Sequence, residues 1–219
     1  VFLMTLPSAC GLIVLGEPIV RLLYSHGGAF KESDVPMTAS ALSGYSIGLT
    51  GYAAIKVLSP AFYAMDDART PMIISVASIL VNIVACYFFM QVFSSIGVTD
   101  AHPNGLGHVG VSLATSTVAL VNFFALAFLM RRKIARLNGR EIAASFFKIA
   151  AASAVMSAVA YASFHLLTKI FVHKTFAVSF VEALVPIGIA AAVFLVSAKL
   201  LRIREVEQVI ATLRRKLAR

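Results

Sequence analysis

Apolar segments of about twenty residues recur along the whole chain, and each is long enough to cross the ~30 Å hydrocarbon core of a bilayer as a helix. The composition agrees, because 59% of the 219 residues are hydrophobic and 13% are charged, with a mean hydropathy of +0.88. A soluble domain of this size does not need so much apolar material, and a membrane β-barrel would show short alternating segments. The sequence therefore predicts an all-α integral membrane protein.

Six transmembrane helices are expected from this pattern. Asp34 with Pro36 opens the second, and Thr70 followed by Pro71 is expected to cap the third. After the sixth, residues 201–219 place apolar side chains three and four apart among basic ones. That spacing predicts an amphipathic tail helix on the anionic inner leaflet, with a plain solvated terminus as the alternative. The six spans lie at about 1–24, 37–64, 71–93, 109–130, 142–166 and 179–200.

The distribution of basic residues predicts the orientation of the spans. Of the 19 Lys and Arg residues, fourteen fall on one side of the membrane, one (Lys56) lies within a span, and four fall on the other side: Arg21, Lys31, Lys169 and Lys174. Because cytoplasmic loops carry the excess of positive charge, both ends of the chain are expected to be cytoplasmic. The net charge of +9 then reflects topology, and no groove or recognition helix suggests nucleic-acid binding.

The chain begins at Val1 inside an apolar run, without a basic leader or a small-residue cleavage pattern. We therefore expect no signal peptide, and we expect a C-terminal fragment of a longer protein.

Lys56 is the most informative residue, because it is an ammonium inside an apolar helix. Such a charge facing lipid costs ~2.5 kcal/mol or more. At about 100° per residue, Lys56 shares a sector with Gly44, Gly48, Gly51, Tyr52, Ser59 and Tyr63, together with the apolar Ile55 and Phe62. Pro60 has no N–H, so the Lys56 carbonyl loses its helical donor and the helix is expected to kink. We interpret Lys56, Tyr52, Ser59 and Tyr63 as the lining of a wet cavity that receives an anion.

Two other interpretations of Lys56 stay open. The side chain could extend to the nearer interface, or it could neutralise an acidic residue on another helix.

Three charged residues at span ends are candidates for gating. Glu17 and Arg21 are spaced i, i+4 near the outer end of the first span, which favours either a self-neutralised pair or part of a gate. Arg69 lies in a short cytoplasmic turn after Asp66 and Asp67. It is either solvated or holds the closed state of an inner gate.

Polar residues elsewhere in the spans are few. Asn82 and Asn122 lie near the middles of the third and fourth spans, where a packing hydrogen bond is the expected role. Glu182 opens the sixth span and is expected to be wet. The last two spans have almost no polar interior, which is typical of a surface for lipid or an acyl-like chain.

No pattern for chemistry stands out. Gly105 to Gly110 matches GxGxxG, but no strand precedes it and no acidic residue follows about twenty residues later. Cys10 and Cys86 fall in apolar spans, and the histidines form no ligand pair. We expect no catalytic triad, no metal site and no cofactor, and hence no enzyme.

Two blocks resemble the MurJ (MviN) family of lipid II flippases. The first runs from Lys56 to Ala64 (Lys-Val-Leu-Ser-Pro-Ala-Phe-Tyr-Ala), and the second from Asp67 to Pro71 (Asp-Ala-Arg-Thr-Pro). Residues 17–24, 28–30 and 110–116 add to the likeness, which covers nearly the whole chain.

The resemblance implies a MATE-like bundle of the MOP superfamily with fourteen transmembrane helices. This chain would be the last six: residues 1–130 would be the final four helices of the second lobe, and 131–200 two additional helices with a groove for the lipid tail. The implied function is moving lipid II, the undecaprenyl-diphosphate-linked disaccharide-pentapeptide, from the inner to the outer leaflet of the bacterial inner membrane for peptidoglycan synthesis. The implied partners are lipid II, membrane lipids and the missing N-terminal lobe, with Lys56 lining a cationic cavity. Apart from the resemblance, the kink expected at Pro60 predicts a hinge that lets this helix bend between states.

Other functions remain as alternatives. A related exporter of polyprenyl-linked saccharides would use a similar cavity, whereas a cation-coupled drug exporter would be expected to carry an acidic residue that the middles of these spans lack. A non-transporting membrane scaffold would tolerate a neutral residue at Lys56. A lipid-carrier transferase would need metal-binding acidic loops, for which Asp66 and Asp67 are too few.

Overall fold

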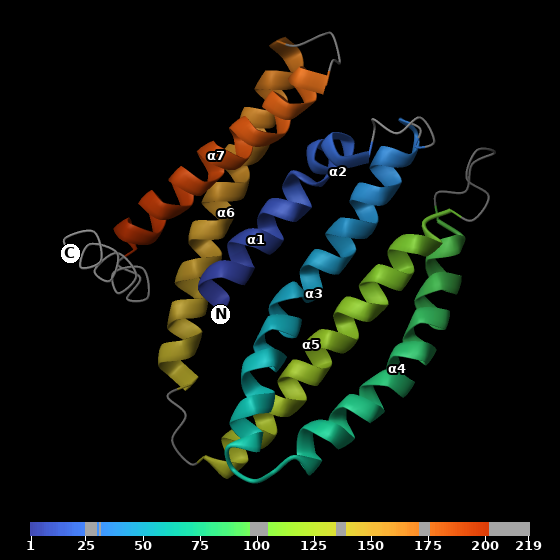
Figure 1. Ribbon diagram of the computed structural model, residues 1–219, viewed down its shortest axis with the longest axis vertical. Coiled ribbons are helices and arrows are strands. Elements are labelled where there is room, and N and C mark those ends of the chain that lie inside the picture. Colours follow the sequence, from blue (N-terminus) through green and yellow to red (C-terminus); the bar gives the residue numbers. More distant parts are fainter. Residues whose placement is uncertain (25–29, 31, 97–104, 135–138, 171–175, 202–219) are drawn as a thin grey trace. The chain divides into compact units, whose positions relative to one another are not determined.

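The computed structural model of the chain describes residues 1–24, 30, 32–96, 105–134, 139–170 and 176–201, and within them it has seven helices, labelled in Figure 1. They divide into two compact units. Unit 1 consists of Val1 and Lys31–Leu137, and unit 2 consists of Phe2–Phe30 and Asn138–Arg219. The predicted tail helix lies outside the described residues apart from Leu201, so it stays a prediction.

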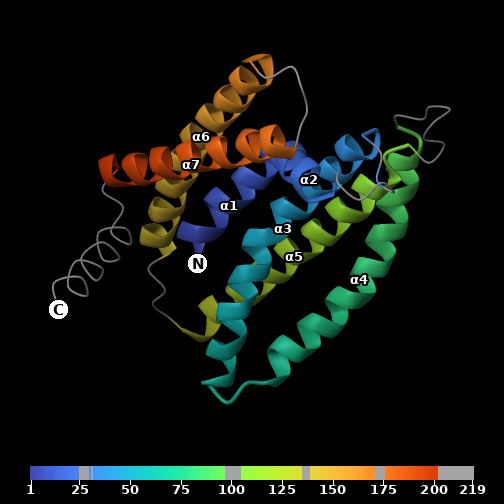
Figure 2. The same ribbon diagram turned by 45° about the horizontal axis from the view of Figure 1, so that its top comes forward.

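Unit 1 is a layer of three helices: α3 (Asp34–Tyr63), α4 (Arg69–Ser94) and α5 (Gly107–Lys133). Helix α5 lies in the middle and packs against both others, whereas α3 and α4 barely touch (Figures 1 and 2). One side of α5 leaves large apolar residues exposed, among them Val121, Phe124 and Phe128. Exposed apolar side chains on a helix of this length are typical of contact with lipid.

The contact between α3 and α5 depends on small residues. A Cβ atom added to Gly48 would lie 2.7 Å from the Cα atom of Ser116, and one added to Gly51 would lie 3.0 Å from the Ala119 carbonyl oxygen. The Ser116 hydroxyl donates a hydrogen bond of 2.6 Å to the carbonyl oxygen of Gly44. Small residues let two membrane helices approach closely, and polar groups then bond across the seam.

A second contact joins the far end of α3 to α5. Phe62 is fully buried and packs with Leu126 and Met130 of α5 in a small hydrophobic core. Ile55 and Leu58 of α3 cover this core from the side before Pro60. Helix α3 is therefore held on α5 both before and after its internal proline.

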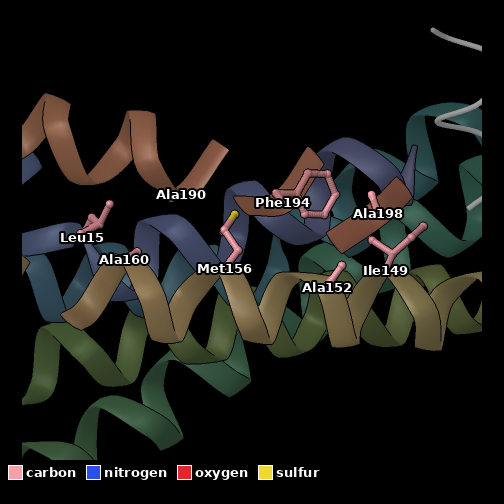
Figure 3. Close-up of a cluster of buried hydrophobic side chains, with 8 residues drawn as sticks. All are labelled: Leu15, Ile149, Ala152, Met156, Ala160, Ala190, Phe194 and Ala198. Atoms are coloured by element: carbon pink, nitrogen blue, oxygen red, sulfur yellow. The ribbon is translucent and has the colours of Figure 1, made fainter. Parts of the chain in front are cut away.

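Unit 2 contains α1 (Phe2–Val14), α2 (Gly16–Tyr24), α6 (Gly139–Ile170) and α7 (Phe176–Leu200). Helix α6 packs against α7 and α1, and α2 packs against α7. The core combines four alanines with four large apolar side chains (Figure 3): Leu15, Ile149, Ala152, Met156, Ala160, Ala190, Phe194 and Ala198. The family lobes place α1 and α2 together with α3 to α5, and that grouping stays a prediction.

The first predicted span is broken in the structure. Helices α1 and α2 meet at a bend of 75° at Leu15. Pro18 has no N–H to bond the carbonyl of Val14, and Gly16 adds backbone freedom, so the straight helix ends here. The Ile19 N–H still bonds the Leu15 carbonyl oxygen at 3.1 Å, which restarts the helix in a new direction.

The all-α membrane fold is confirmed, but the count of six spans is not. Among the described residues, α4, α5, Glu141–Lys169 of α6 and Val178–Leu200 of α7 are long and apolar enough to cross a membrane, and the bent pair α1–α2 makes five if it counts as one span. Helix α3 has 30 residues but is not among them. Its glycines, serines and tyrosines, together with Lys56, lower its hydropathy, so its crossing remains a prediction.

Candidate functional site

The candidate site is an exposed stripe along α3 that contains Lys56. Tyr45, Tyr52, Lys56 and Tyr63 follow one another at spacings of seven, four and seven residues, which places them on one face of the helix. The three tyrosines are 47%, 44% and 55% exposed, and Lys56 is exposed too. Ser59 lies half-buried beside them. We refer to Tyr45, Tyr52, Lys56, Ser59 and Tyr63 as the α3 stripe.

The structure divides the sector that the sequence predicted for Lys56. Gly44, Gly48 and Gly51 are buried in the seam with α5. Phe62 points into the hydrophobic core beyond them, and Ile55 packs against that core. The predicted sector therefore mixed a packing surface with the exposed stripe, because helical periodicity alone does not tell a glycine that packs from one that lines a cavity.

Lys56 has no carboxylate beside it within the described parts of the chain. An intramembrane ammonium that neutralises a carboxylate would have that carboxylate within about 4 Å. The interpretation of Lys56 as half of an internal ion pair thus gains no support from the described residues. The cavity and interface interpretations both agree with an exposed side chain.

A polar patch joins α4 and α5 near the α3 stripe. The Cys86 thiol donates to Asn82 Oδ1 at 3.6 Å, and its sulfur lies 3.9 Å from the Thr115 hydroxyl. Tyr52 lies close enough to Cys86 for an electrostatic interaction. Asn82 accepts this bond from its own helix, so the interhelical packing bond expected for it stays a prediction. Sequence reasoning missed Cys86 and Thr115, because a cysteine and a threonine in apolar spans carry no distinctive pattern.

In the part of the chain that the structure describes, Asn122 does not accept the packing hydrogen bond that was predicted for it. Its Oδ1 atom is buried and accepts no hydrogen bond within the described residues. An unsatisfied amide oxygen is costly in a low-dielectric interior, so this position is a candidate for contact with water or a ligand group.

The turn between α3 and α4 is fastened to the end of α5 through Asp67. The Asp67 carboxylate accepts hydrogen bonds from the Thr70 N–H (3.1 Å), from the Thr70 hydroxyl (2.6 Å) and from the Lys133 ammonium. The Lys133 ammonium also lies 5.8 Å from the centre of the Phe62 ring. We refer to the Asp67–Lys133 ion pair as the turn clasp.

The turn clasp bears on two sequence interpretations. Thr70 was expected to cap α4, but it lies in the first turn, and Asp67 provides the capping acceptor. Arg69 as the residue that holds a closed state stays a prediction, and the charge pair at this turn is formed by Asp67 and Lys133. Lys133 was missed because 66 residues separate it from Asp67 and a one-helix pattern cannot join them.

The turn clasp predicts an acid-sensitive contribution to stability. The bonds from Lys133 and then Thr70 lower the pKa of Asp67 from 3.8 to about 2. A carboxylate whose pKa is lowered on folding stabilises the fold above its unfolded pKa and loses this effect as pH falls through the folded value. We expect the thermal stability of the full-length wild-type protein to fall as the pH is lowered from 5 to about 2. The Asp67→Asn variant should lack the part of this fall that comes from protonation of Asp67. If stability depends on pH identically in both proteins, the stabilising role of Asp67 is contradicted.

The other charged candidates lie in unit 2. Glu17 is exposed in the first turn of α2 and Arg21 lies in its last turn, and no ion pair joins these two described residues. Glu182 was expected to be wet, and this is wrong: it is 3% exposed. Its position on the helix places it with Ser179, Ala183 and Pro186 on the buried face of α7.

Unit 2 also holds an apolar cavity of about 530 Å³. It is lined by α1 through Pro7 and Gly11, by α6 through Met156, and by α7 through Ile187 and Phe194. Two of them, Met156 and Phe194, also belong to the core of Figure 3. Its lining suits a hydrocarbon chain and offers little to a polar molecule.

No cluster of three or more His, Cys, Asp or Glu side chains that could hold a metal ion occurs within the described residues.

Comparison with known proteins decides the family. The family described as "Lipid II flippase MurJ" matches residues 1–182, which is most of the chain. The chain belongs to the MurJ family. The resemblance found in the sequence is thereby confirmed at the level of the family, and MurJ is named as a flippase, a transport protein rather than an enzyme.

Individual MurJ proteins are similar over parts of the chain. A "Probable lipid II flippase MurJ" of Rickettsia prowazekii is 32% identical over 120 residues, which cover 55% of this chain and 21% of that protein. The "Lipid II flippase MurJ" of Burkholderia cenocepacia is 32% identical over 132 residues (60% and 23%). A "Probable lipid II flippase MurJ" of Buchnera aphidicola is 30% identical over 167 residues (76% and 30%).

A solved MurJ structure has a similar fold. "Lipid II flippase MurJ, inward closed conformation" matches with a TM-score of 0.69 and 27% identity, covering 91% of this chain and 36% of that one. This chain thus spans between a fifth and about a third of the MurJ proteins it matches.

Proposed function

We propose that the chain is the C-terminal part of a lipid II flippase and contributes the last six of its fourteen transmembrane helices, with α1 and α2 together as one. The whole protein then moves lipid II from the inner to the outer leaflet of the bacterial inner membrane by alternating access, for cell wall biogenesis. The family match supports the activity. The excess of basic residues on one side supports cytoplasmic ends, and the missing N-terminal lobe completes the bundle.

The α3 stripe carries this proposal, because it exposes an ammonium with no carboxylate partner in the described part of the chain. A diphosphate bears several negative charges and accepts charge-assisted hydrogen bonds, which are about twice as strong as neutral ones. Lys56 would bind the diphosphate directly. This contact supplies the partner that a lysine within a membrane otherwise lacks.

The other residues of the stripe offer hydrogen-bond donors around the ammonium. Tyr52 and Tyr63 are exposed four residues before and seven after Lys56, and Ser59 lies between. Each hydroxyl can donate to a phosphate or sugar oxygen. Pro60 lacks an N–H, which leaves the Lys56 carbonyl as a further acceptor for water or substrate.

Gating is proposed for charged residues at the span ends. Arg69 begins α4 beside the turn clasp, and Glu17 and Arg21 occupy the first and last turns of α2. Charged groups at the two ends of a transport path can pair in one state and separate in the other. Pro60, which lacks an N–H, is the hinge predicted for the same movement.

The apolar cavity of unit 2 is proposed to receive the lipid tail. It lies between α1, α6 and α7, and α6 and α7 are the additional pair to which the family resemblance gives a tail groove. Burying hydrocarbon contributes about 25 cal/mol per Å².

Complementation tests the proposed function. The full-length gene is expressed in a bacterium whose own lipid II flippase is depleted, and growth and lipid II in the outer leaflet are measured. We expect restored growth and restored outer-leaflet lipid II. The proposal is contradicted if the protein reaches the membrane in normal amount and restores neither.

A further inference from the structure

The α3 stripe belongs to a helix that is fixed to α5 along its length. Before Pro60, the seam places Gly48 and Gly51 against the backbone of Ser116 and Ala119. After Pro60, Phe62 is buried between Leu126 and Met130. Bending α3 at Pro60 would open one of these contacts, and close-packed interfaces switch between discrete arrangements rather than deforming continuously.

The turn clasp closes the same assembly at its end. Phe62 and Tyr63 are followed by a tight turn in which Asp66 adopts a φ of +57° and Asp67 N–H bonds the Phe62 carbonyl at 3.1 Å. The carboxylate of Asp67 is bound to α4 through Thr70 and to α5 through Lys133. One residue therefore joins three helix ends: its N–H bonds the end of α3, and its carboxylate bonds the start of α4 and the end of α5.

The geometry of the clasp is more constrained than that of an ordinary surface pair. The side chain of Asp67 is only 14% exposed, and it accepts three hydrogen bonds in a fixed turn. Lys133 is placed over the Phe62 ring, so the clasp and the buried core support each other. The neighbouring Arg131 is exposed and has no such contact with Asp67.

From these contacts we propose that Asp67 and Lys133 are positioning residues that lock α3, α4 and α5 into one rigid body, so that Lys56 changes its access by movement of all of unit 1 and not by bending of α3 at Pro60. The proposal rests on the proposed function, because it concerns how a substrate-binding lysine is moved. It replaces the hinge assigned to Pro60 with a helix of fixed shape.

A substrate-free measurement tests the rigid body first. In the full-length protein, with Cys10 and Cys86 replaced by alanine, spin labels are placed at two exposed positions, Val57 on α3 and Phe128 on α5. The rigid body predicts one narrow distance distribution that is unchanged by conditions that switch the protein between its states. A second distance that gains population on switching would overturn the proposal. Because no lipid II is used, this result does not depend on the proposed function.

Substitution of the clasp then tests the positioning role. Lys133→Gln removes the ion pair and keeps the Thr70 cap, and Arg131→Gln is the matched control on the same helix end. We expect Lys133→Gln to lower the rate of lipid II flipping in vesicles roughly twofold to fivefold, with unchanged affinity for lipid II and unchanged protein yield. Arg131→Gln should leave the rate unchanged. Equal rates for Lys133→Gln and the wild type, or a fall in affinity in place of rate, would contradict the positioning role.

A reversible covalent lock separates a rigid body from a hinge. Asp67→Cys with Lys133→Cys is joined in the full-length protein by a short bis-methanethiosulfonate reagent and then released by reduction. The rigid body predicts that the joined protein flips faster than its reduced form, since the link replaces the lost ion pair. A rate that is unchanged or lower when the link is present would overturn the proposal. If the wild type flips no lipid II in the same vesicles, the proposed function fails, and the label distances alone decide the rigid body.

Discussion

Replacing Lys56 with methionine in the full-length protein is expected to abolish complementation while the protein still inserts into the membrane in normal amount. Methionine keeps most of the length of the side chain and removes the charge. Losing one partner of a desolvated charge contact costs about 2–5 kcal/mol, which corresponds to roughly a 30-fold or larger loss of affinity for the diphosphate. Growth of the depleted strain and lipid II affinity of the purified protein are the two measurements.

Two controls isolate the charge at position 56. Lys56→Arg keeps the charge and should retain part of the activity, because the guanidinium differs in shape from the ammonium but also binds phosphate. Lys199→Met removes an exposed lysine from the last turn of α7 and should leave growth unchanged. Full complementation by Lys56→Met would remove the substrate-binding role and favour a non-transporting scaffold or a lysine that only extends to the interface.

The second large effect is expected at the seam of unit 1. In Gly48→Ala the new Cβ would lie 2.7 Å from the Ser116 Cα atom, so the two backbones must separate. Overpacking of this kind costs about 1–3 kcal/mol of stability. Gly48→Leu adds a larger side chain at the same place, so its cost should be higher and should prevent folding. Thermal unfolding of the purified full-length protein and its yield in membranes measure the effect.

Gly188 in α7 provides the matched control for Gly48. A Cβ added there meets nothing within 4 Å. Because alanine restricts the unfolded chain more than glycine, Gly188→Ala is expected to be neutral or to stabilise by up to about 1 kcal/mol. A Gly48→Ala variant as stable as Gly188→Ala would show that the seam is looser than the structure has it.

The sequence predicted the helical fold well because membrane spans are encoded locally. Runs of apolar residues fix where α4, α5, α6 and α7 lie, whatever their neighbours are. Helix α3 shows the limit of this signal. Its packing glycines and its polar stripe lower its hydropathy, so it is not among the helices apolar enough to count as a span. The bend at Leu15 was also missed, since Gly16 and Pro18 within an apolar run do not by themselves predict a 75° turn.

The candidate site was predicted only where it depends on one helix. Lys56, Tyr52 and Tyr63 share an exposed face as the periodicity indicated. Features formed by two helices were not predicted: the glycines that face α5, the Asp67–Lys133 pair and the patch of Cys86 with Thr115. Such pairs are joined by tertiary packing, which a single sequence does not encode in any local pattern.

The central claim is that Lys56 faces water and meets the diphosphate of the substrate. It is tested most directly by labelling the native lysine in the full-length wild-type protein with a water-soluble, membrane-impermeant acylating reagent, and by measuring the modified fraction of the Lys56 and Lys199 peptides by mass spectrometry. We predict that Lys56 is labelled in the absence of substrate and protected by lipid II, while labelling of Lys199 does not change. A Lys56 that stays unlabelled when Lys199 reacts, or one that reacts equally with and without lipid II, would contradict the claim.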